Sequence, residues 1–480
     1  MTIRTAKTNL RLSVSLLAFV LAVPFASSQE SASPAADESQ SDGQTQVELW
    51  EETLRFGIDA EIEALLGQIE QADVTELDTQ VAQRFRRSRS TDLRVTIIEY
   101  FDRRDSPAIV DDVKVLLLGD EILAEDFVRV GSGYLSKQLS DYDPELIERY
   151  QEIAQDADVL TASIVIEAIG RSGAPSAVSR LLELYEELTQ TDQRAAILRA
   201  LGHTGSNEAL PLLSQIARDE FEESALRHYA TESLGRIGSG ESVDLLTRLL
   251  ADNDAVLRAY ATRALGFYPS ETSLSYLNEA LLDSFWRVRV AALRGIAEQQ
   301  AEEVVGAVAY KALRDPERPV REEAVRTLGA IGNGEATAAL AEVLSDERAA
   351  EALRMSAAQQ LLSVDATGQR ETFEQVISNE WSREGSRLLD SVAKGVSEVG
   401  DAAFESFYLR FLDHPNFIIR IYGMRGIGNA GLSGRIDALK DIARENPRGI
   451  MRTSALTALE KMGVNYDPDQ DESEATESAE

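Results

Sequence analysis

Apolar residues recur along most of this chain at the three- and four-residue spacing that is typical of amphipathic helices. The pattern begins near Val47 and continues to about residue 464, with short polar segments between the apolar stretches. In SGESVDLLTRLLADNDAVLRAYATRALGFY, for example, two apolar-striped stretches flank a polar turn. The pattern therefore predicts an all-α chain built from pairs of helices.

The predicted helix pairs repeat with a nearly constant period. An arginine opens the second helix of most pairs at intervals of 31 to 35 residues, if Ala162 is counted in the same position. These arginines are Arg94, Arg129, Arg194, Arg227, Arg258, Arg289, Arg321, Arg354, Arg387, Arg420 and Arg452. A fixed period of about 20–50 residues is typical of solenoids, whose units contact only their neighbours. We expect a solenoid over residues 47–464, with 47–74 as its N-terminal cap and about twelve repeats after it.

Glycines follow the repeat position at two fixed distances. Eight residues after it come Gly170, Gly202, Gly235, Gly266, Gly329, Gly395 and Gly428. Glycine favours the left-handed turn that ends many helices, so we expect these residues to close the second helices. A second glycine three residues later marks the turn into the next unit, at Gly173, Gly205, Gly238, Gly332 and Gly431.

The best-conforming units resemble a known repeat. LTRLLADNDAVLRAYATRALG and YKALRDPERPVREEAVRTLGAIG are similar to the short HEAT-like repeat of the phycobilisome-lyase type. The resemblance covers roughly residues 75–464, and the units around Arg129 and Arg387 fit it least well. It implies a right-handed α-solenoid, with the first helices on the convex side and the second helices on the concave side.

Residues 1–28 have the features of a signal peptide. Three basic residues precede an apolar stretch at 12–23, and small residues follow at 26–28. That stretch is shorter than the about 20 residues that a membrane-spanning helix requires. No lipobox cysteine follows it. We expect cleavage after Ser28 and an exported protein, periplasmic or secreted, without a membrane span after cleavage; an uncleaved anchor is the alternative.

Two acidic segments flank the predicted solenoid. Residues 29–46 and 465–480 are polar and lack helical periodicity, which predicts a disordered linker and a disordered tail. The tail contains Asp467, Asp469 and Asp471 at the spacing that begins a calcium loop, but it lacks the glycine and the glutamate that complete such a loop. Weak attraction of calcium by the acidic tail stays an open alternative.

Charge and cysteine content exclude several classes of function. The net charge is −34, and loss of the three basic residues of the signal peptide would make it −34 − 3 = −37. Such a charge disfavours binding to nucleic acids and to anionic membranes. The absence of cysteine excludes disulfides, thiolate metal sites and cysteine nucleophiles.

The repeat arginines are candidates for a structural ladder. An acid usually lies in the turn before them, as Asp252 precedes Arg258. We expect charge-assisted Asp–Arg hydrogen bonds to brace the helix starts and to join adjacent units, and direct ligand contact is the alternative. The ladder residues are Arg227, Arg258, Arg289, Arg321, Arg354, Arg420 and Arg452.

A second set of residues is a candidate for a partner-binding groove. Its members lie mostly five or nine residues after the repeat position, and these two positions share a helix face because they differ by four. The set is Arg171, Arg199, His203, Arg236, Tyr260, Arg263, Arg294, Arg326 and Arg425. By the resemblance, this face borders the concave groove. It would either hold an acidic segment of a partner protein or be ordinary surface with arginines paired to nearby acids.

No catalytic set of residues or zinc-binding spacing occurs in the chain. HEAT-repeat hydroxylases hold a di-iron site with repeated His-Glu pairs, whereas Thr204, Tyr229 and Pro415 follow the three histidines here. We therefore expect a non-catalytic protein-interaction scaffold of the cell envelope that needs no cofactor. The alternatives are a HEAT-like lyase or hydroxylase, or a subunit of one, and a self-associating structural rod.

Overall fold

The computed structural model describes residues 46–468 apart from 120–122, 140–143, 173, 175 and 447. This part of the chain forms 26 α-helices and no strand, so the predicted all-α solenoid is confirmed. The predicted signal peptide, the linker up to residue 45 and the tail beyond Pro468 lie outside the described residues, as does Gly173.

The helices are arranged in consecutive pairs. The first helices of the pairs are α1 (Gln46–Phe56), α3 (Asp78–Arg87), α5 (Val110–Leu118), α7 (Pro144–Asp156), α9 (Ala177–Glu187), α11 (Leu210–Arg218), α13 (Val243–Leu249), α15 (Ser270–Ala280), α17 (Val305–Arg314), α19 (Gly334–Ser345), α21 (Arg370–Glu380), α23 (Glu405–Leu412) and α25 (Ile436–Glu445). The second helices are α2 (Asp59–Gln71), α4 (Thr91–Arg103), α6 (Glu125–Gln138), α8 (Val159–Arg171), α10 (Thr191–Thr204), α12 (Ser224–Ile237), α14 (Ala255–Leu265), α16 (Trp286–Glu298), α18 (Arg318–Ile331), α20 (Glu351–Val364), α22 (Arg387–Val399), α24 (Phe417–Asn429) and α26 (Ile450–Lys461). Short 3-10 turns precede α11, α13, α17, α23 and α25.

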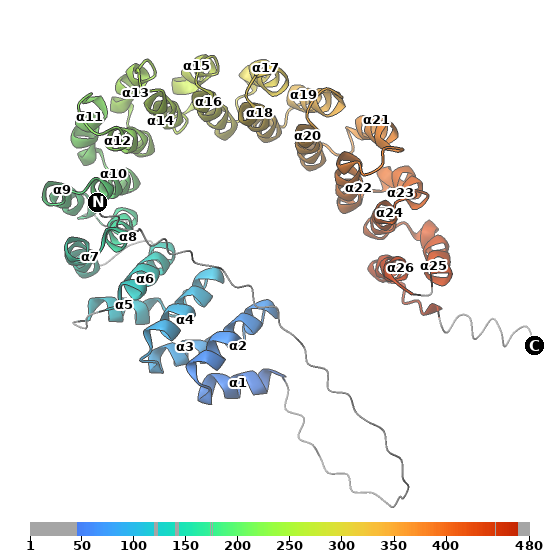
Figure 1. Cartoon of the computed structure of the whole chain (residues 1–480), viewed down its shortest axis with the longest axis horizontal. Coiled ribbons are helices and arrows are strands. Elements are labelled where there is room, and N and C mark those ends of the chain that lie inside the picture. The colour runs from blue at the N-terminus through green and yellow to red at the C-terminus, as the bar shows by residue number, and fades with distance from the viewer. Residues whose placement is uncertain are drawn as a thin grey trace, which may run out of the picture.

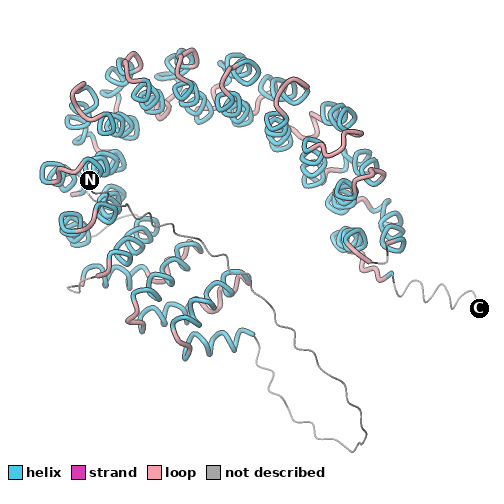
Figure 2. Tube along the Cα trace, in the orientation of Figure 1, coloured by secondary structure: helices cyan, strands magenta, loops and turns pink. Residues whose placement is uncertain are grey.

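The pairs follow one another along an open arc (Figure 1). Helices α11, α13, α15 and α17 lie on its outer side, and α12, α14, α16 and α18 lie on its inner side. Only short loops join the helices along the arc (Figure 2). The pairs from α3 to α26 number twelve, as the period of the arginines predicted. The segment predicted as a cap forms one further pair, because α1 packs on α3 and α2 packs on α4.

One apolar core runs along the whole array between the two helix layers. Leu257, Ala261 and Leu265 of α14 are completely buried, at the spacing that places them on one face of the helix. Leu277 of the outer helix α15 is buried in the same layer. Each such leucine stabilises the fold by about 1.5–3 kcal/mol, and these contributions come from within a unit and from its neighbours.

The expectation that the first set of glycines closes the second helices in a left-handed turn is wrong. Gly202 and Gly235 lie inside α10 and α12, and Gly266 directly follows α14 with a right-handed φ of −62°. These glycines instead let successive inner helices touch. A Cβ atom on Gly235 would lie 2.5 Å from the Cα of Ala264 on the next inner helix. The left-handed turn comes three residues later, as at Gly238 with a φ of 69°.

The close contact of the inner helices shapes the arc. Successive inner helices pack tightly against one another, whereas neighbouring outer helices contact each other much less. All glycines of the first set except Gly395 meet a residue six positions after the repeat arginine of the next unit, for example Gly170 against Ala200 and Gly202 against Ser233. A closer spacing on one side of the stack bends it toward that side, so the second helices line the concave face.

The arginine ladder joins neighbouring pairs at the turns between first and second helices. The guanidinium of Arg258 donates to both carboxylate oxygens of Asp283, with distances of 2.8 and 3.0 Å, and to the carbonyl of Asp252 at 3.0 Å. Arg289 contacts both oxygens of Asp315 at 2.8 and 2.7 Å and the carbonyl of Asp283 at 2.8 Å. Each of these arginines therefore binds a carbonyl of its own unit and a carboxylate of the next unit.

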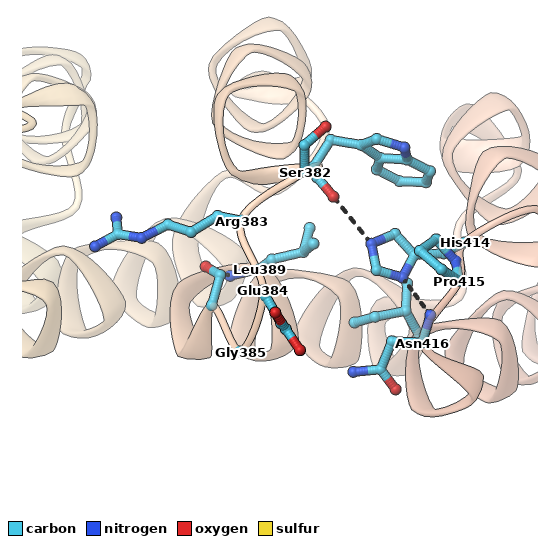
Figure 3. A pocket seen from close by; sticks show the side chains of 11 residues that line it. Ser382, Arg383, Glu384, Gly385, Leu389, His414, Pro415 and Asn416 are labelled. Carbon is cyan, nitrogen blue, oxygen red and sulfur yellow. Dashed lines mark hydrogen bonds between the residues drawn. The ribbon is translucent and has the colours of Figure 1, made fainter.

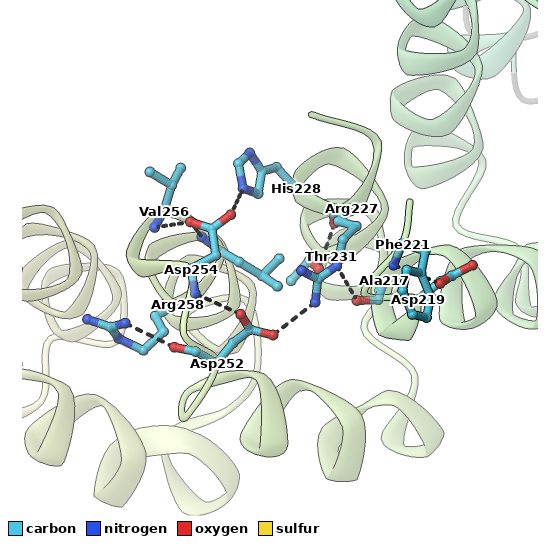
Figure 4. Close-up of polar contacts among 11 residues, drawn as sticks. Ala217, Asp219, Phe221, Arg227, His228, Thr231, Asp252, Asp254, Val256 and Arg258 are labelled. Carbon is cyan, nitrogen blue, oxygen red and sulfur yellow. Dashed lines mark hydrogen bonds and ion pairs between the residues drawn. The ribbon is translucent and has the colours of Figure 1, made fainter. Parts of the chain in front are cut away.

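The same aspartates also hold their own turns. Asp252 accepts the N–H of Asp254 at 2.8 Å while it receives Arg227 at 2.9 Å (Figure 4). Asp283 accepts the N–H of Phe285 at 2.7 Å. Burial alone would raise the pKa of the Asp283 carboxyl, but the hydrogen bonds from Arg258 and Phe285 outweigh it and lower this pKa. Because the folded pKa is lowered, the stability that this carboxylate adds is present at neutral pH and is lost as the pH falls through the folded pKa.

The ladder is uneven along the chain. Arg354 binds Glu380 at 3.1 Å in place of an aspartate. Arg321 donates to the carbonyls of Asp315 and Pro316 in its own turn, at 2.6 and 3.0 Å. The Nε of Arg420 is buried and has no hydrogen-bond partner within the described residues. Arg452 lies in the last helix, α26.

Substitution of Gly235 by alanine tests the close helix contact. The added Cβ would overlap the backbone of α14, so we expect Gly235→Ala to destabilise the protein by about 1–3 kcal/mol, although alanine favours helices. Gly67→Ala in α2 is the matched control, because a Cβ there meets nothing within 4 Å. It should stabilise the protein by up to about 1 kcal/mol. Urea denaturation followed by circular dichroism measures both changes, and equal effects at the two positions would contradict the glycine assignment.

Removal of one ladder arginine tests the buried ion pair. The side chains of Arg289 and Asp315 are only 7% and 1% exposed. Arg289→Met removes two hydrogen bonds from this carboxylate and leaves it the N–H of Glu317 and the ion pair with Lys311 at 3.4 Å, so we expect a destabilisation of about 3 kcal/mol. Arg289→Met combined with Asp315→Asn should recover part of that loss, because the second change removes the buried charge. Arg318→Met, which removes an exposed pair with Glu322, should change the stability by less than about 1 kcal/mol. A loss for Arg289→Met no greater than for Arg318→Met would contradict the ladder.

Candidate functional site

The candidate groove arginines form a regular structure on the inner helices. In three places one glutamate lies between two arginines of the set, and we call each such group a triad. The triads are Glu167 with Arg171 at 3.6 Å and Arg199 at 2.9 Å, Glu232 with Arg236 at 3.0 Å and Arg263 at 3.3 Å, and Glu323 with Arg326 at 2.6 Å and Arg294 at 3.4 Å.

Each triad joins two successive inner helices. Glu232 and Arg236 belong to α12, and Arg263 belongs to α14. The first triad joins α8 to α10 in the same way, and the third joins α16 to α18. In the first two triads this arrangement follows from the repeat, because the glutamate and the arginine of the next helix occupy equal positions in successive units. In the third triad the glutamate lies on the later helix, three residues before Arg326. The triads therefore lie in a row from α8 to α18.

The arginines of the triads lie outside their glutamates. The six arginine side chains are between 32% and 61% exposed, whereas Glu232 and Glu323 are 10% exposed and Glu167 is 29% exposed. A guanidinium has five N–H donors, and each arginine uses only some of them on its glutamate. The part of each triad that faces solvent is consequently mainly arginine, so it is more positive than a count of two arginines and one glutamate indicates.

Aromatic rings lie among the triads. Tyr260 of α14 stacks on His228 of α12 with ring centroids 5.1 Å apart. Tyr229 contacts the ring of Tyr260 edge-on, with a centroid distance of 6.2 Å. Burial, and then the neighbouring Tyr229 and Glu232, raise the pKa of Tyr260. Arg199 lies over the ring of Tyr229 at 4.7 Å. The guanidiniums and rings thus form one mixed surface across α10, α12 and α14.

His203 adds no positive charge to this surface at neutral pH. It is half-buried in α10, and burial followed by the charges of Arg171 and Arg236 lowers its pKa. Arg425 stands apart from the row, on α24. It lies 4.0 Å from Glu398 and over the ring of Tyr422 at 5.5 Å. The structure therefore places all the predicted groove residues except Arg425 on the consecutive inner helices α8 to α18.

Sequence reasoning missed two parts of this site. The three glutamates were not singled out, although Glu167 and Glu232 occupy the same repeat position as Arg199 and Arg263. Phe267 was missed because only basic residues were sought nine residues after the repeat arginine, where His203 and Arg236 also lie. Arg236 lies over the ring of Phe267 at 5.6 Å.

A separate hollow of about 420 Å³ lies near the C-terminal end, between the α21–α22 and α23–α24 loops (Figure 3). His414 lines it and is 8% exposed. Its Nε2 lies 3.1 Å from the carbonyl oxygen of Trp381, and its Nδ1 accepts the N–H of Asn416 at 3.0 Å. The His414 ring therefore accepts the N–H two residues later and stabilises its turn, as Asp252 and Asp283 do in their turns. Both ring nitrogens have a hydrogen-bond partner.

Two further findings concern the chemistry that the described residues offer. No group of three or more histidine, aspartate or glutamate side chains arranged to hold a metal ion occurs among them. None of the helices in the same part of the chain combines the length and the hydropathy that crossing a membrane requires.

Comparison with solved structures finds low similarity to other helical arrays. The karyopherin Kap121p bound to the C-terminus of the protein phosphatase Cdc14p is 12% identical with a TM-score of 0.40, over 86% of this chain and 53% of that chain. The complex of CpcE and CpcF of phycocyanin lyase from Nostoc sp. PCC7120 is 22% identical with a TM-score of 0.32, over 51% of this chain and 94% of that chain. Likenesses at this level carry no argument about function.

Comparison of sequences places the chain in a family. It is 44% identical to deoxyhypusine hydroxylase of Neurospora crassa over 50 residues, which are 10% of this chain and 15% of that enzyme. The chain therefore matches only a small part of this curated relative. The family model described as Spirochaete HEAT repeat protein, in contrast, matches residues 54–461. This match extends over nearly all of the described helices, and the chain belongs to the spirochaete HEAT repeat protein family.

Proposed function

We propose that this protein is a non-catalytic scaffold whose concave face binds an extended segment of a partner protein. One observation carries the proposal: the arginines of the three triads face outward over less exposed glutamates, in a row on the inner helices from α8 to α18. A stack of repeats offers a long surface on which such a row can follow an extended chain.

The chemistry of the row favours an acidic partner segment. Guanidinium groups bind carboxylates through two parallel hydrogen bonds, and the unused N–H donors of the triad arginines are available for this geometry. Tyr229 and Tyr260 offer apolar contact between the charges. The net charge of −34 repels nucleic acids and other polyanions over longer distances, so recognition here is local and depends on the fit to the row.

We also propose that the protein acts outside the cytoplasm, in the periplasm or after secretion, and that its partner belongs to the cell envelope. This part of the proposal rests on the signal-peptide pattern of residues 1–28.

Neutralisation of three consecutive groove arginines tests the scaffold. We expect Arg263→Gln, Arg294→Gln and Arg326→Gln together to reduce partner capture at least tenfold, because the row loses all its arginines on α14, α16 and α18. The measurement is cross-linking in intact cells followed by affinity capture from the envelope fraction and mass spectrometry, with the capture repeated at high salt.

The control removes the same number of positive charges from the outer helices. Arg180→Gln, Arg248→Gln and Arg314→Gln lie on α9, α13 and α17, and this variant should capture the partner as the unchanged protein does. The control variant should keep a Tm within a few degrees of the unchanged protein, since exposed pairs contribute about 0–1 kcal/mol each. The groove variant takes both arginines from Glu323, which is 10% exposed, so we expect a lower Tm for it, and capture is measured well below that Tm. Equal capture by both variants would reject the concave face as the binding surface.

Export is tested by one change in the apolar stretch. Leu17→Arg interrupts residues 12–23 with a charge, so we expect the variant to stay in the cytoplasmic fraction with an intact N-terminus. The unchanged protein should appear outside the cytoplasm with Gln29 as its first residue. Cell fractionation and N-terminal sequencing measure both outcomes, and a cytoplasmic location of the unchanged protein would refute export.

A further inference from the structure

A hollow of about 570 Å³ lies between the inner helices α14 and α16. Arg263 and Arg294 line it from the two helices, Phe267 lines it from the link after α14, and Ala291 and Glu298 line it from α16. We propose that this hollow is an anchor site, which receives one large apolar side chain of the partner and binds an acidic residue beside it. This inference rests on the proposed function and specifies the chemistry of its central contact.

The hollow exists because two glycines meet at this joint. A Cβ on Gly266 would lie 3.0 Å from the Cα of Gly295, and a Cβ on Gly295 would lie 3.0 Å from the Cα of Gly266. At the preceding joint, Gly235 meets the side chain of Ala264 instead. Gly295 occupies the repeat position that Ala264 has in the preceding unit, but it has no side chain. Backbone atoms therefore form part of the lining of the hollow.

The wall of the hollow is apolar and open to solvent. Phe267 is 48% exposed, although a ring of this size is usually buried. Ala291 continues the apolar lining on α16 and is 8% exposed. A volume of about 570 Å³ lies within the range of about 300–1,000 Å³ that is typical of ligand pockets. A phenylalanine or leucine side chain of a partner would bury this wall without a change in the helices.

The charge around the hollow is positive on one side only. Arg263 and Arg294 are 49% and 61% exposed, and the glutamates that they contact, Glu232 and Glu323, are 10% exposed. Glu298 lies one helical turn beyond Arg294 and lines the hollow as well. The arginines favour a carboxylate beside the anchor residue, and Glu298 opposes a second carboxylate at its own end. The hollow therefore fits a segment with acidic residues on one side of the apolar residue.

Three labelled peptide designs, the first of them made in two orientations, test the anchor site with the full-length protein. One peptide has a central phenylalanine with aspartate and glutamate on its N-terminal side and glycine and serine on its C-terminal side, and its reversed form is measured in parallel. The second has alanine in place of the phenylalanine, and the third has lysines in place of the acids. In fluorescence anisotropy, we expect the first peptide in one of its two orientations to bind at least tenfold more tightly than the second and the third.

Variants of the lining residues assign the binding to this hollow. Ala291→Leu fills the hollow and should weaken the phenylalanine peptide at least tenfold, while Ala330→Leu on α18 is the matched control and should leave it unchanged. Arg263→Gln with Arg294→Gln should also weaken this peptide at least tenfold. Glu298→Gln should strengthen it two- to threefold, because the opposing charge is removed.

The results separate the anchor site from the scaffold function. Equal binding of the three peptides, no binding of any of them, or full binding to the Ala291→Leu variant would overturn the anchor site. If partner capture in cells still depends on Arg263, Arg294 and Arg326 in that case, the scaffold function stands without the anchor. If capture is also independent of these arginines, both proposals fall.

Discussion

The structure depends on a partly buried aspartate that serves two units at once. Asp283 accepts the backbone N–H of Phe285 in its own turn and two hydrogen bonds from Arg258 of the preceding unit. A buried carboxylate is stable only when its oxygens have such partners, so the turn and the joint support each other. Because Arg289 and Asp315 repeat this arrangement, the angle between successive units is set by the same bonds along the middle of the array.

The concave surface is a consequence of how closely the inner helices approach. Gly235 lets α12 lie against α14, and this distance is what allows Glu232 to reach Arg263 on the next helix. A wider spacing would leave the glutamate under its own arginine only, without a link to the next unit. The row of outward guanidiniums and the packing of the solenoid are therefore two results of one spacing.

The period of the arginines predicted the twelve helix pairs, because every unit packs on its neighbours through residues at the same repeat positions. The partners of those arginines were harder to infer. Asp252 is the acid that the repeat pattern places in the turn before Arg258, yet it offers this arginine only its carbonyl, and the carboxylate comes from Asp283. The site shows the same limit: the candidate arginines could be located by register, but their pairing through Glu232 depends on which side chains of the next helix come within reach.

The ladder also bears on how such a chain can change its length over generations. A unit of the central array brings an aspartate for the unit before it and an arginine for the unit after it, as Asp283 and Arg289 show. Loss of the unit that contains Asp283 and Arg289 would bring Arg258 opposite Asp315, a residue of the same kind as its present partner. Between Arg227 and Asp315, duplication or deletion of a whole unit thus leaves the new joint with a complete ion pair, and the length of the binding surface is free to vary while the fold is preserved.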